Sequence, residues 1–524
     1  MAYPALELGL GSYSIPSPSE KPIPYLATVF LFIVLFYAMG DSGPNLPEIN
    51  PLKPFEFTNS RRMTEFVQQS KDIFLRATAT FGKNPYRLYS EWGASVVLPA
   101  DFIHELRSDP RLDFITPASD DSHGYIPGFE PFAGNDDSPK VVTKYLTKAL
   151  IRKSFKADLR VTSAKLTKPI SEEATIVLKQ IFTDKKEWHE MVPKDDIIRV
   201  VSRMSTRVFM GGELCQDDEW IKASSEYTAA AFGVGWELGY YPRWSRPYVH
   251  WFLPSCWRVR RLLADCRRIL KPHLERRKVK KSQGVQFDDS IEWFEEVYKN
   301  RKYDPATEQI TLSLVAIHTT SDLLQTVLID LARNPELIQP LRDELARVLP
   351  AEGLKKTALY NLKLMDSVIK ESQRMKPVLL STWRRLATAD ITLSNGFKIR
   401  KGQKIIANNT HMWDEQWYEN ASKYDGYRFL NMRSTDEEKY AHLVSTSSKH
   451  PGFGHGQHAC PGRFFAANEI KIALAHILLK YDWKLPEGCN PQPVPFGMAL
   501  LPDPTVKMQI RRRKEEIDLD SIDC

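Results

Sequence analysis

A glycine-rich turn that ends in a cysteine and leads into a helix constrains this chain more than any other feature. The turn reads FGHGQHACPGR over residues 453–463. Proline is favoured in the first turn of a helix, and the segment after Pro461 carries apolar residues at helical spacing. We therefore expect Cys460 at a helix N-terminus, where free N–H groups and the helix dipole stabilise a thiolate. Because the glycines let the backbone approach the sulfur, the pattern indicates a soft-metal ligand rather than a buried structural cysteine.

The other cysteines and the charge balance exclude several classes of protein. The chain has six cysteines in 524 residues and no CxxC pair. This spacing indicates neither a zinc site nor a disulfide framework, and it fits a reducing compartment. A net charge of +7 is mild for this length, so we expect no nucleic-acid partner.

An uncharged, apolar stretch lies near the N-terminus. It reads YLATVFLFIVLFYAM over residues 25–39 and as a helix would cover roughly 22 Å of a ~30 Å hydrocarbon core. We predict an N-terminal tail at 1–22, a transmembrane anchor at 23–40 and a proline-rich linker at 41–58. A cleaved signal peptide is the alternative, because its apolar region has a similar length. The flanking charges are too few to settle the orientation of the anchor.

The remainder is predicted to be one mainly α-helical domain with small β-sheets at 59–513, followed by a charged C-terminal tail at 514–524. No internal repeat divides this domain. Short strands are expected near Ser95–Leu98, at Ile391–Ile399 and in the C-terminal region.

One long apolar segment is predicted to form a helix buried on all sides. It runs from Gln309 to Arg333 and ends where Asn334 precedes a proline. Five successive polar residues, HTTSD at 318–322, interrupt it. Hydroxyls that bond back to their own helix are the structural alternative. Because the cluster lies in the middle of a buried helix, we expect it to be functional.

A glutamate and an arginine are spaced to form an ion pair. Glu371 and Arg374 lie one helical turn apart, so their side chains can meet on one helix face. Alone, such a pair is typical of a protein surface and contributes under about 1 kcal/mol.

In this order, the motifs resemble the cytochrome P450 superfamily. The cysteine turn matches its signature, Phe-x-x-Gly-x-(Arg or His)-x-Cys-x-Gly, through Phe453, Gly456, His458, Cys460 and Gly462. The resemblance extends over about residues 51–513. It implies the cytochrome P450 fold, with haem b bound between the long buried helix and the cysteine loop, and Cys460 as the thiolate ligand of the iron. Phe453 and Gly454 are then expected beside the haem.

The resemblance also gives roles to the other motifs. Glu371, Arg374 and Arg428 are expected to form a buried cluster that supports the cysteine loop. The family's oxygen-activation motif aligns with Val315–Thr320, so Thr319, with His318 and Thr320, is the predicted catalytic group. The sequence departs from the family there, because Ala316 replaces a glycine and His318 replaces an acid. A histidine with an ordinary pKa near 6.5 can relay protons.

Cations are expected near the haem propionates. The resemblance places His458 and Arg385 there, with Arg384 as a substitute. The usual Trp-x-x-x-Arg motif is absent, and Lys144 and Lys148 stand in its place, with a solvated basic face as the alternative. These lysines, together with Arg152, Lys153 and Arg463, would form a basic patch that steers an acidic reductase.

The resemblance implies an oxidoreductase, a haem-thiolate monooxygenase that uses O2 and electrons from NADPH–cytochrome P450 reductase. The stretches AIHTTSD and RVFMGGELCQDDEW (207–220) resemble fungal microsomal members, including ent-kaurene oxidase and indole-diterpene oxidases. A bulky hydrophobic substrate, of the terpenoid type found in fungal secondary metabolism, is the expected one. The implied location is the endoplasmic reticulum membrane, single-pass, with the catalytic domain in the cytosol. The alternatives are an isomerase or dehydratase that needs no reductase, and a non-catalytic haem carrier.

Substrate contacts are expected in segments that are largely apolar or aromatic, consistent with a hydrophobic ligand. The family places them at His123–Phe132, Phe232–Trp236, Val315–Thr319, Val378–Thr382 and Gly497–Leu500. An aromatic run from Trp236 to Trp257 either packs inside the domain or dips into the membrane interface.

Overall fold

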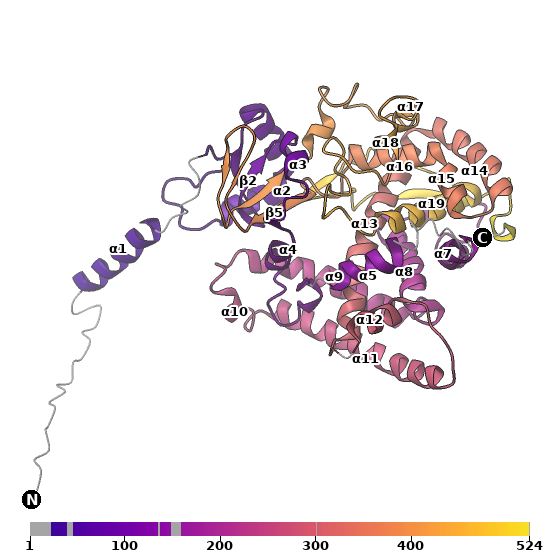
Figure 1. Cartoon of the computed structure of the whole chain (residues 1–524), viewed down its shortest axis with the longest axis horizontal. Coiled ribbons are helices and arrows are strands. Elements are labelled where there is room, and N and C mark those ends of the chain that lie inside the picture. Colours follow the sequence, from indigo (N-terminus) through magenta and orange to yellow (C-terminus); the bar gives the residue numbers. More distant parts are fainter. Residues whose placement is uncertain (1–21, 39–45, 135–136, 148–158, 300, 523–524) are drawn as a thin grey trace, which may run out of the picture. The chain divides into compact units, whose positions relative to one another are not determined.

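The structure is a computed structural model that describes residues 22–38, 46–134, 137–147, 159–299 and 301–522 (Figure 1). The chain divides into two compact units, residues 1–47 and residues 48–524. The second unit is mainly helical with small sheets, as the sequence predicted. It begins with Glu48, inside the stretch predicted to be a linker. Glu48 forms an ion pair with Arg62, and the Asn50 side chain donates to the Tyr89 carbonyl at 2.8 Å.

The described part of the first unit is the helix α1 (Pro22–Ala38). Its 17 residues carry no charge, and Ile23, Leu26 and Phe30 are exposed. At 1.5 Å rise per residue, a helix of this length covers about 25 Å. Among the described residues, one helix combines the length and apolar composition needed to cross a membrane, and this is α13 (Pro305–Arg333) of the second unit. Because 67% of its most apolar stretch is buried inside the protein, α13 is a core helix.

The long helix α13 runs through the middle of the second unit (Figure 1). It packs against α8 (Pro193–Leu214), α16 (Lys363–Met375) and α19 (Arg463–Lys480). It begins four residues before the predicted start, because Asp304 caps it by accepting the Ala306 N–H at 3.1 Å and Pro305 occupies its first turn. It ends at Arg333, as predicted.

The second unit contains further α-helices in its described residues. They are α2 (Ser60–Phe81), α3 (Asp101–Leu106), α4 (Ile115–Asp121), α5 (Asp137–Val141), α7 (Leu159–Ile181), α8 (Pro193–Leu214), α9 (Asp218–Gly239), α10 (Arg246–Val249), α11 (Pro254–Ser282), α12 (Ser290–Tyr298), α14 (Ile338–Glu352), α15 (Lys356–Asn361), α16 (Lys363–Met375), α17 (Arg428–Met432), α18 (Glu438–Ala441) and α19 (Arg463–Lys480).

Four small sheets complete the second unit. The largest has the strand order β1-β2-β8-β5-β3, in which only β2 and β8 are parallel. Its strands are β1 (Tyr86–Ser90), β2 (Gly93–Leu98), β3 (Leu112–Asp113), β5 (Trp383–Ala387) and β8 (Lys404–Ala407). This sheet lies at one side of the unit, and α14, α15, α16 and α19 lie at the other (Figure 1).

The remaining sheets confirm the strands expected at Ile391–Ile399 and near the C-terminus. A hairpin joins β6 (Ile391–Thr392) to β7 (Lys398–Ile399), and another joins β10 (Val494–Phe496) to β11 (Ala499–Leu501). The third sheet has the order β4-β12-β9, formed by β4 (His189–Met191), β9 (Tyr481–Lys484) and β12 (Met508–Arg512).

The C-terminal segment docks on this core. Leu519 is buried, and the Asp520 carboxylate accepts from Lys480 of α19 at 2.8 Å and from Thr175 of α7 at 2.5 Å. Residues 514–522, predicted to be a charged tail, therefore contact the catalytic unit.

Candidate active site

The cysteine turn is held in place by its own backbone and by its neighbours. The Cys460 N–H donates to the Phe453 carbonyl at 2.8 Å, and the Gln457 N–H donates to the Arg107 carbonyl at 3.0 Å. Gly454 and Gly456 have φ angles of +71° and +86°, in the left-handed region that favours glycine. A Cβ at Gly456 would lie 2.0 Å from the Arg107 carbonyl oxygen, so this position has room only for glycine.

The sulfur lies just before a helix rather than in its first turn. The helix α19 begins at Arg463 with Gly462 as its N-cap, so Pro461 is not the first helical residue as predicted. Burial raises the pKa of the Cys460 thiol, and the backbone N–H groups of Gly462 and Arg463, together with the Arg463 guanidinium, offset part of that rise. The turn therefore supplies the donors that a thiolate needs, by a different local geometry.

In the predicted glutamate–arginine cluster, Glu371 and Arg374 are fully buried and Arg428 is partly buried. Arg374 binds both oxygens of Glu371 at 2.8 Å, and Arg428 reaches the same carboxylate at 3.1 Å. Arg374 also donates to the Met412 carbonyl at 2.6 Å and to the Ala421 carbonyl at 2.8 Å. A surface ion pair is therefore excluded, and the cluster ties α16 to the segment that precedes the cysteine turn. Its supporting role for a haem stays a prediction.

The hydroxyl face of α13 borders accessible space, although the helix is otherwise buried. Val315 is 54% exposed, and Thr319, one turn later, is exposed while its hydroxyl donates to the Val315 carbonyl at 2.8 Å. The neighbouring Thr320 is buried, and its hydroxyl oxygen has no hydrogen-bond partner among the described residues. Thr319 is thus the hydroxyl of this cluster that a ligand can reach.

His318 differs from the ordinary histidine assumed from the sequence. Its ring lies edge-on to Phe232, with centroids 6.4 Å apart, and burial lowers its pKa to about 4. The imidazole is therefore neutral near pH 7 and can donate a hydrogen bond from one ring nitrogen and accept one at the other, but it does not carry the charge of the acid that the family places there.

Two predicted propionate ligands meet around Phe114. The His458 ring stacks on Phe114 at 5.6 Å between centroids, and the Arg385 guanidinium lies 5.3 Å from the centre of the same ring. Arg385 is buried, and burial lowers its pKa to about 10. No carboxylate of the described residues pairs with it, and its one hydrogen bond is to the Arg384 carbonyl at 2.6 Å. A buried guanidinium without an acid partner is suited to bind an anion, such as a propionate.

The other predicted cations have protein partners or lie outside the described residues. Arg384 pairs with Asp121 at 3.1 Å. Lys144 is 50% exposed and pairs with Glu296 at 2.6 Å. Arg463 donates to the Cys460 carbonyl at 2.7 Å and to the Val444 carbonyl at 3.1 Å. Lys148, Arg152 and Lys153 of the predicted basic patch lie outside the described residues.

The segments predicted to contact substrate lie side by side. Phe132 packs edge-on against Phe232, with centroids 5.5 Å apart, and Trp236 stacks on Phe496 at 4.1 Å. His123 binds the Gly235 carbonyl at 2.9 Å. The Leu380 N–H donates to the Met498 carbonyl at 2.7 Å. The structure therefore joins all five predicted segments into one neighbourhood of largely apolar and aromatic side chains.

Several buried contacts here involve residues that no motif singles out. The Phe114 ring contacts both the His458 ring and the Arg385 guanidinium. The buried Glu91 carboxylate accepts the Met498 N–H at 2.7 Å, and burial raises the pKa of Glu91 to about 7. Lys376 binds Asp322 and the Leu500 carbonyl. Phe114, Glu91 and Lys376 are remote in sequence from their partners, so no local sequence pattern could have predicted these contacts.

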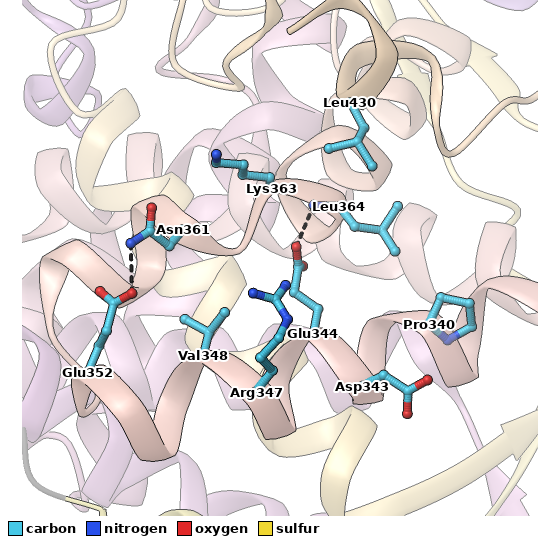
Figure 2. A pocket seen from close by; sticks show the side chains of 10 residues that line it. All are labelled: Pro340, Asp343, Glu344, Arg347, Val348, Glu352, Asn361, Lys363, Leu364 and Leu430. Atoms are coloured by element: carbon cyan, nitrogen blue, oxygen red, sulfur yellow. Dashed lines mark hydrogen bonds between the residues drawn. The ribbon is translucent and has the colours of Figure 1, made fainter. Parts of the chain in front are cut away.

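A pocket of about 680 Å³ lies elsewhere, among α14, α15, α16 and α17 (Figure 2). Its polar groups hold helix ends together: the Glu344 carboxylate accepts the Leu364 N–H at 2.8 Å, and Asn361 donates to Glu352 at 2.7 Å. None of the predicted site residues lines it. Its lining consists of Pro340, Asp343, Glu344, Arg347, Val348, Glu352, Asn361, Lys363, Leu364 and Leu430.

The donor set indicates what kind of metal centre Cys460 can serve. Among the described residues, no group of three or more His, Cys, Asp or Glu side chains is placed to hold a metal ion. The iron of a porphyrin has four ligands from the ring, so a single protein thiolate such as that of Cys460 would suit it. A mainly helical fold with such a cysteine, a hydroxyl on a core helix and a buried glutamate–arginine cluster defines the class of haem-thiolate proteins known as cytochromes P450.

The chain belongs to the cytochrome P450 family, because residues 132–510 match the family model for Cytochrome P450. It is 50% identical over 507 residues to the cytochrome P450 monooxygenase eqxH of Fusarium heterosporum, covering 95% of this chain and 96% of that protein. It is 40% identical to the cytochrome P450 monooxygenase hepE of Aspergillus oryzae, covering 93% and 89% of the two chains. It is 39% identical to the cytochrome P450 monooxygenase TRI1 of Fusarium sporotrichioides, covering 90% and 86%. The chain is therefore a cytochrome P450 monooxygenase, an oxidoreductase, and the family implies a haem-thiolate cofactor.

Proposed function

We propose that this monooxygenase inserts one oxygen atom into a bulky hydrophobic small molecule of the terpenoid type, with haem b bound through Cys460. The reaction converts a C–H bond, O2, NADPH and a proton into C–OH, water and NADP+. The observation that carries the proposal is the Cys460 thiol, held just before a helix by a glycine turn whose His458 contacts the same Phe114 ring as Arg385, a buried guanidinium without an acid partner among the described residues.

The chain's own residues bind and orient the cofactor. The N–H groups of Gly462 and Arg463 stabilise the negative charge of the Cys460 sulfur. Arg385 and His458 would hold the propionates beside Phe114, where burial strengthens each charge-assisted hydrogen bond. When bound, the haem supplies oxygen activation at an iron whose thiolate ligand favours O–O cleavage.

The residues on α13 then handle protons. The Thr319 hydroxyl is accessible and bonded to its own helix, so it can hold a proton at its oxygen and pass it on. His318 is neutral near pH 7 and lies one residue away, where it would relay a proton by donating from one ring nitrogen and accepting at the other. Thr320 is buried and would support the relay.

The substrate class follows from the lining. The Phe132–Phe232 pair and the Trp236–Phe496 stack offer aromatic surface, and Val315 adds an apolar side chain next to Thr319. Such walls suit a large ligand with few polar groups. Electrons would reach the site from NADPH–cytochrome P450 reductase, whose acidic surface the proposed basic patch, which includes Lys144 and Arg463, would attract.

The same proposal places the enzyme on the endoplasmic reticulum membrane, with α1 as anchor and the catalytic unit in the cytosol. The exposed aromatic side chains around α10 support a second contact with the membrane interface, because aromatic rings favour that region. Trp244 is 76% exposed, Tyr248 68% and Phe252 84%. Packing inside the domain does not account for these three rings.

The first test concerns the thiolate. The reduced carbon monoxide complex of the purified holoenzyme should show the thiolate-type Soret band, and Cys460→Ala should abolish it. Cys489→Ala, at another free cysteine, is the matched control and should keep the band. A band that survives in Cys460→Ala contradicts the proposed ligand.

The second test concerns turnover. The enzyme and a reductase in membranes, with NADPH and O2, should oxidise at least one of the probes limonene, valencene and ent-kaurene. Thr319→Ala should keep the Soret band while product per NADPH falls by about tenfold or more and hydrogen peroxide rises. Thr326→Ala is the matched control, because Thr326 makes the same bond to its own helix, to the Asp322 carbonyl at 2.8 Å, but is buried. Unchanged product per NADPH in Thr319→Ala contradicts the relay.

A further inference from the structure

A buried lysine joins three parts of the candidate site. Lys376 follows α16 and is only 3% exposed. Its ammonium group donates to the Asp322 carboxylate on α13 and, at 2.7 Å, to the Leu500 carbonyl on β11. The backbone beyond Lys376 continues the contact with β11, because the Leu500 N–H donates to the Val378 carbonyl at 3.1 Å.

The partners of Lys376 lie close to the groups that handle oxygen and substrate. Asp322 is three residues after Thr319 on the same helix, so about one helical turn separates them. Segment 378–382 and the turn that leads into β11 are two of the predicted substrate segments, and they hydrogen bond to each other. Lys376 is thus the one described side chain that bonds both α13 and β11.

Stabilisation of the fold does not by itself explain the buried ion pair of Lys376 and Asp322. Burial raises the pKa of Asp322 and lowers that of Lys376, and their mutual attraction opposes both shifts. The second Asp322 oxygen is buried and has no hydrogen-bond partner among the described residues. A buried ion pair of this kind is often no more stabilising than a well-packed apolar pair of the same volume. An apolar pair would not fix the position of β11 relative to α13, because it makes no hydrogen bond to the Leu500 carbonyl.

We propose that Lys376 is a positioning residue that fixes the substrate-contacting strands against α13, and thereby decides which carbon of the substrate faces Thr319. The inference rests on the proposed monooxygenase function. It predicts that the identity of the oxidised position depends on Lys376, although Lys376 touches neither the reacting carbon nor the oxygen. An error of about 1 Å in placement is enough to change relative rates at two positions by tenfold or more.

The experiment replaces the ion pair by an apolar pair and measures products. Asp322→Leu with Lys376→Met leaves no unpaired charge, so the double variant should fold and keep the thiolate-type Soret band. With whichever of limonene, valencene and ent-kaurene the unaltered enzyme oxidises, the ratio of regioisomers should change by about tenfold or more, and product per NADPH should fall. An unchanged ratio and unchanged product per NADPH overturn the proposal.

The matched control is Lys370→Met. Lys370 is also fully buried on α16, but it donates to the Tyr440 and His442 carbonyls, both at 2.7 Å, and not to a substrate segment. We expect this variant to lower the melting temperature and to leave the regioisomer ratio unchanged. An equal change of ratio in Lys370→Met would mean that general loosening of the fold causes it, and would also overturn the proposal.

Two milder variants answer the same question if the double variant does not bind haem. Asp322→Asn keeps an oxygen within reach of Lys376 and should preserve the ratio, whereas Asp322→Ser is too short and should shift it. Equal ratios in the two variants contradict a positioning role. The unaltered enzyme separates the two levels of the argument: no product from it contradicts the proposed function, while product at one constant ratio from every variant contradicts only the role of Lys376.

Discussion

Arg385 of β5 has a buried guanidinium that lacks an acid partner among the described residues. Its positive charge therefore destabilises the folded protein unless a ligand neutralises it. Arg384, the preceding residue of the strand, is neutralised by its ion pair with Asp121. Alternate residues of a strand point to opposite faces, so the two arginines meet different surroundings although they are adjacent. Arg385 faces Phe114 and is near His458.

Replacing Arg385 should therefore weaken haem binding. We expect Arg385→Leu to be purified with a much lower haem-to-protein ratio, because a propionate would lose its buried cation. Lys144→Met is the comparison, since Lys144 is half-exposed and paired with Glu296. Its haem content should fall little, because a solvent-screened charge contributes about 1 kcal/mol or less. Equal losses in the two variants would show that Lys144 holds a propionate as firmly as Arg385.

Glu469 gives the second prediction at the scale of single residues. It is fully buried on α19, where burial raises its pKa to about 8 and the Ser205 hydroxyl donates to one of its oxygens at 2.7 Å. The folded state therefore holds a proton that the unfolded chain releases above its ordinary pKa of 4.5. The stability due to this proton is complete below about pH 4.5 and is lost as the pH rises to about 8.

Glu469→Gln should remove this loss, because the amide keeps the shape and cannot ionise. The free energy of unfolding of the variant relative to the unaltered enzyme, measured by chemical denaturation at each pH, should rise steadily between about pH 5 and pH 8, at up to about 1.4 kcal/mol per pH unit. Glu487→Gln, at an exposed glutamate, should show no such trend. A difference for Glu469→Gln that is constant with pH contradicts a protonated Glu469.

At the scale of one element, the cysteine turn depends on glycine for space as well as for backbone angles. Gly456→Ala would set a Cβ 2.0 Å from the Arg107 carbonyl oxygen, in addition to the strain of a φ angle of +86°. We expect the turn to shift, and the thiolate-type fraction of the reduced carbon monoxide spectrum to fall. The melting temperature should drop by an amount that corresponds to more than about 2 kcal/mol.

Gly488→Ala is the matched control for this prediction. Gly488 has a similar φ angle of +73°, but nothing lies within 4 Å of the position of a Cβ. This variant should cost about 1 kcal/mol from backbone strain alone and keep the spectrum of the unaltered enzyme. Similar spectra for both alanine variants would mean that the contact with Arg107 does not shape the turn.

At the scale of the whole molecule, the division at residues 47 and 48 predicts that the catalytic unit is independent of the N-terminal one. Deletion of residues 1–47 should leave haem content, the Soret band and the melting temperature unchanged. The fraction that sediments with membranes should fall but remain measurable, because the exposed rings Trp244, Tyr248 and Phe252 stay.

The control for the deletion is a triple variant, Trp244→Ser, Tyr248→Ser and Phe252→Ser, in the shortened chain. It should be soluble without detergent and keep the Soret band. If the shortened chain alone is already fully soluble, the aromatic surface does not bind the membrane; if it is unfolded, the boundary at residue 48 is not a domain boundary.

The amino-acid sequence by itself determined the features that depend on interactions between residues close together along the chain. The turn around Cys460 needs glycine at fixed positions, the helix predicted at 309–333 follows from its apolar length and its stop before Pro335, and the strand near Ser95–Leu98 follows from its β-branched residues. Each of these patterns involves residues that are close together in the sequence, so it can be recognised without the tertiary structure. The pairing of Glu371 with Arg374 was predictable for the same reason, since one helical turn brings them together.

Only the tertiary structure decided which distant groups meet, because packing and burial depend on the whole chain. It paired Arg384 with Asp121 and left Arg385 beside Phe114, and it joined Lys376 to Asp322 and Leu500. It also changed the chemistry of His318, because the low polarity around a buried ring disfavours its charged form and lowers its pKa to about 4. The identity of a residue fixes its ordinary pKa and hydrogen-bonding groups, whereas the solvent removed from around it decides how these act.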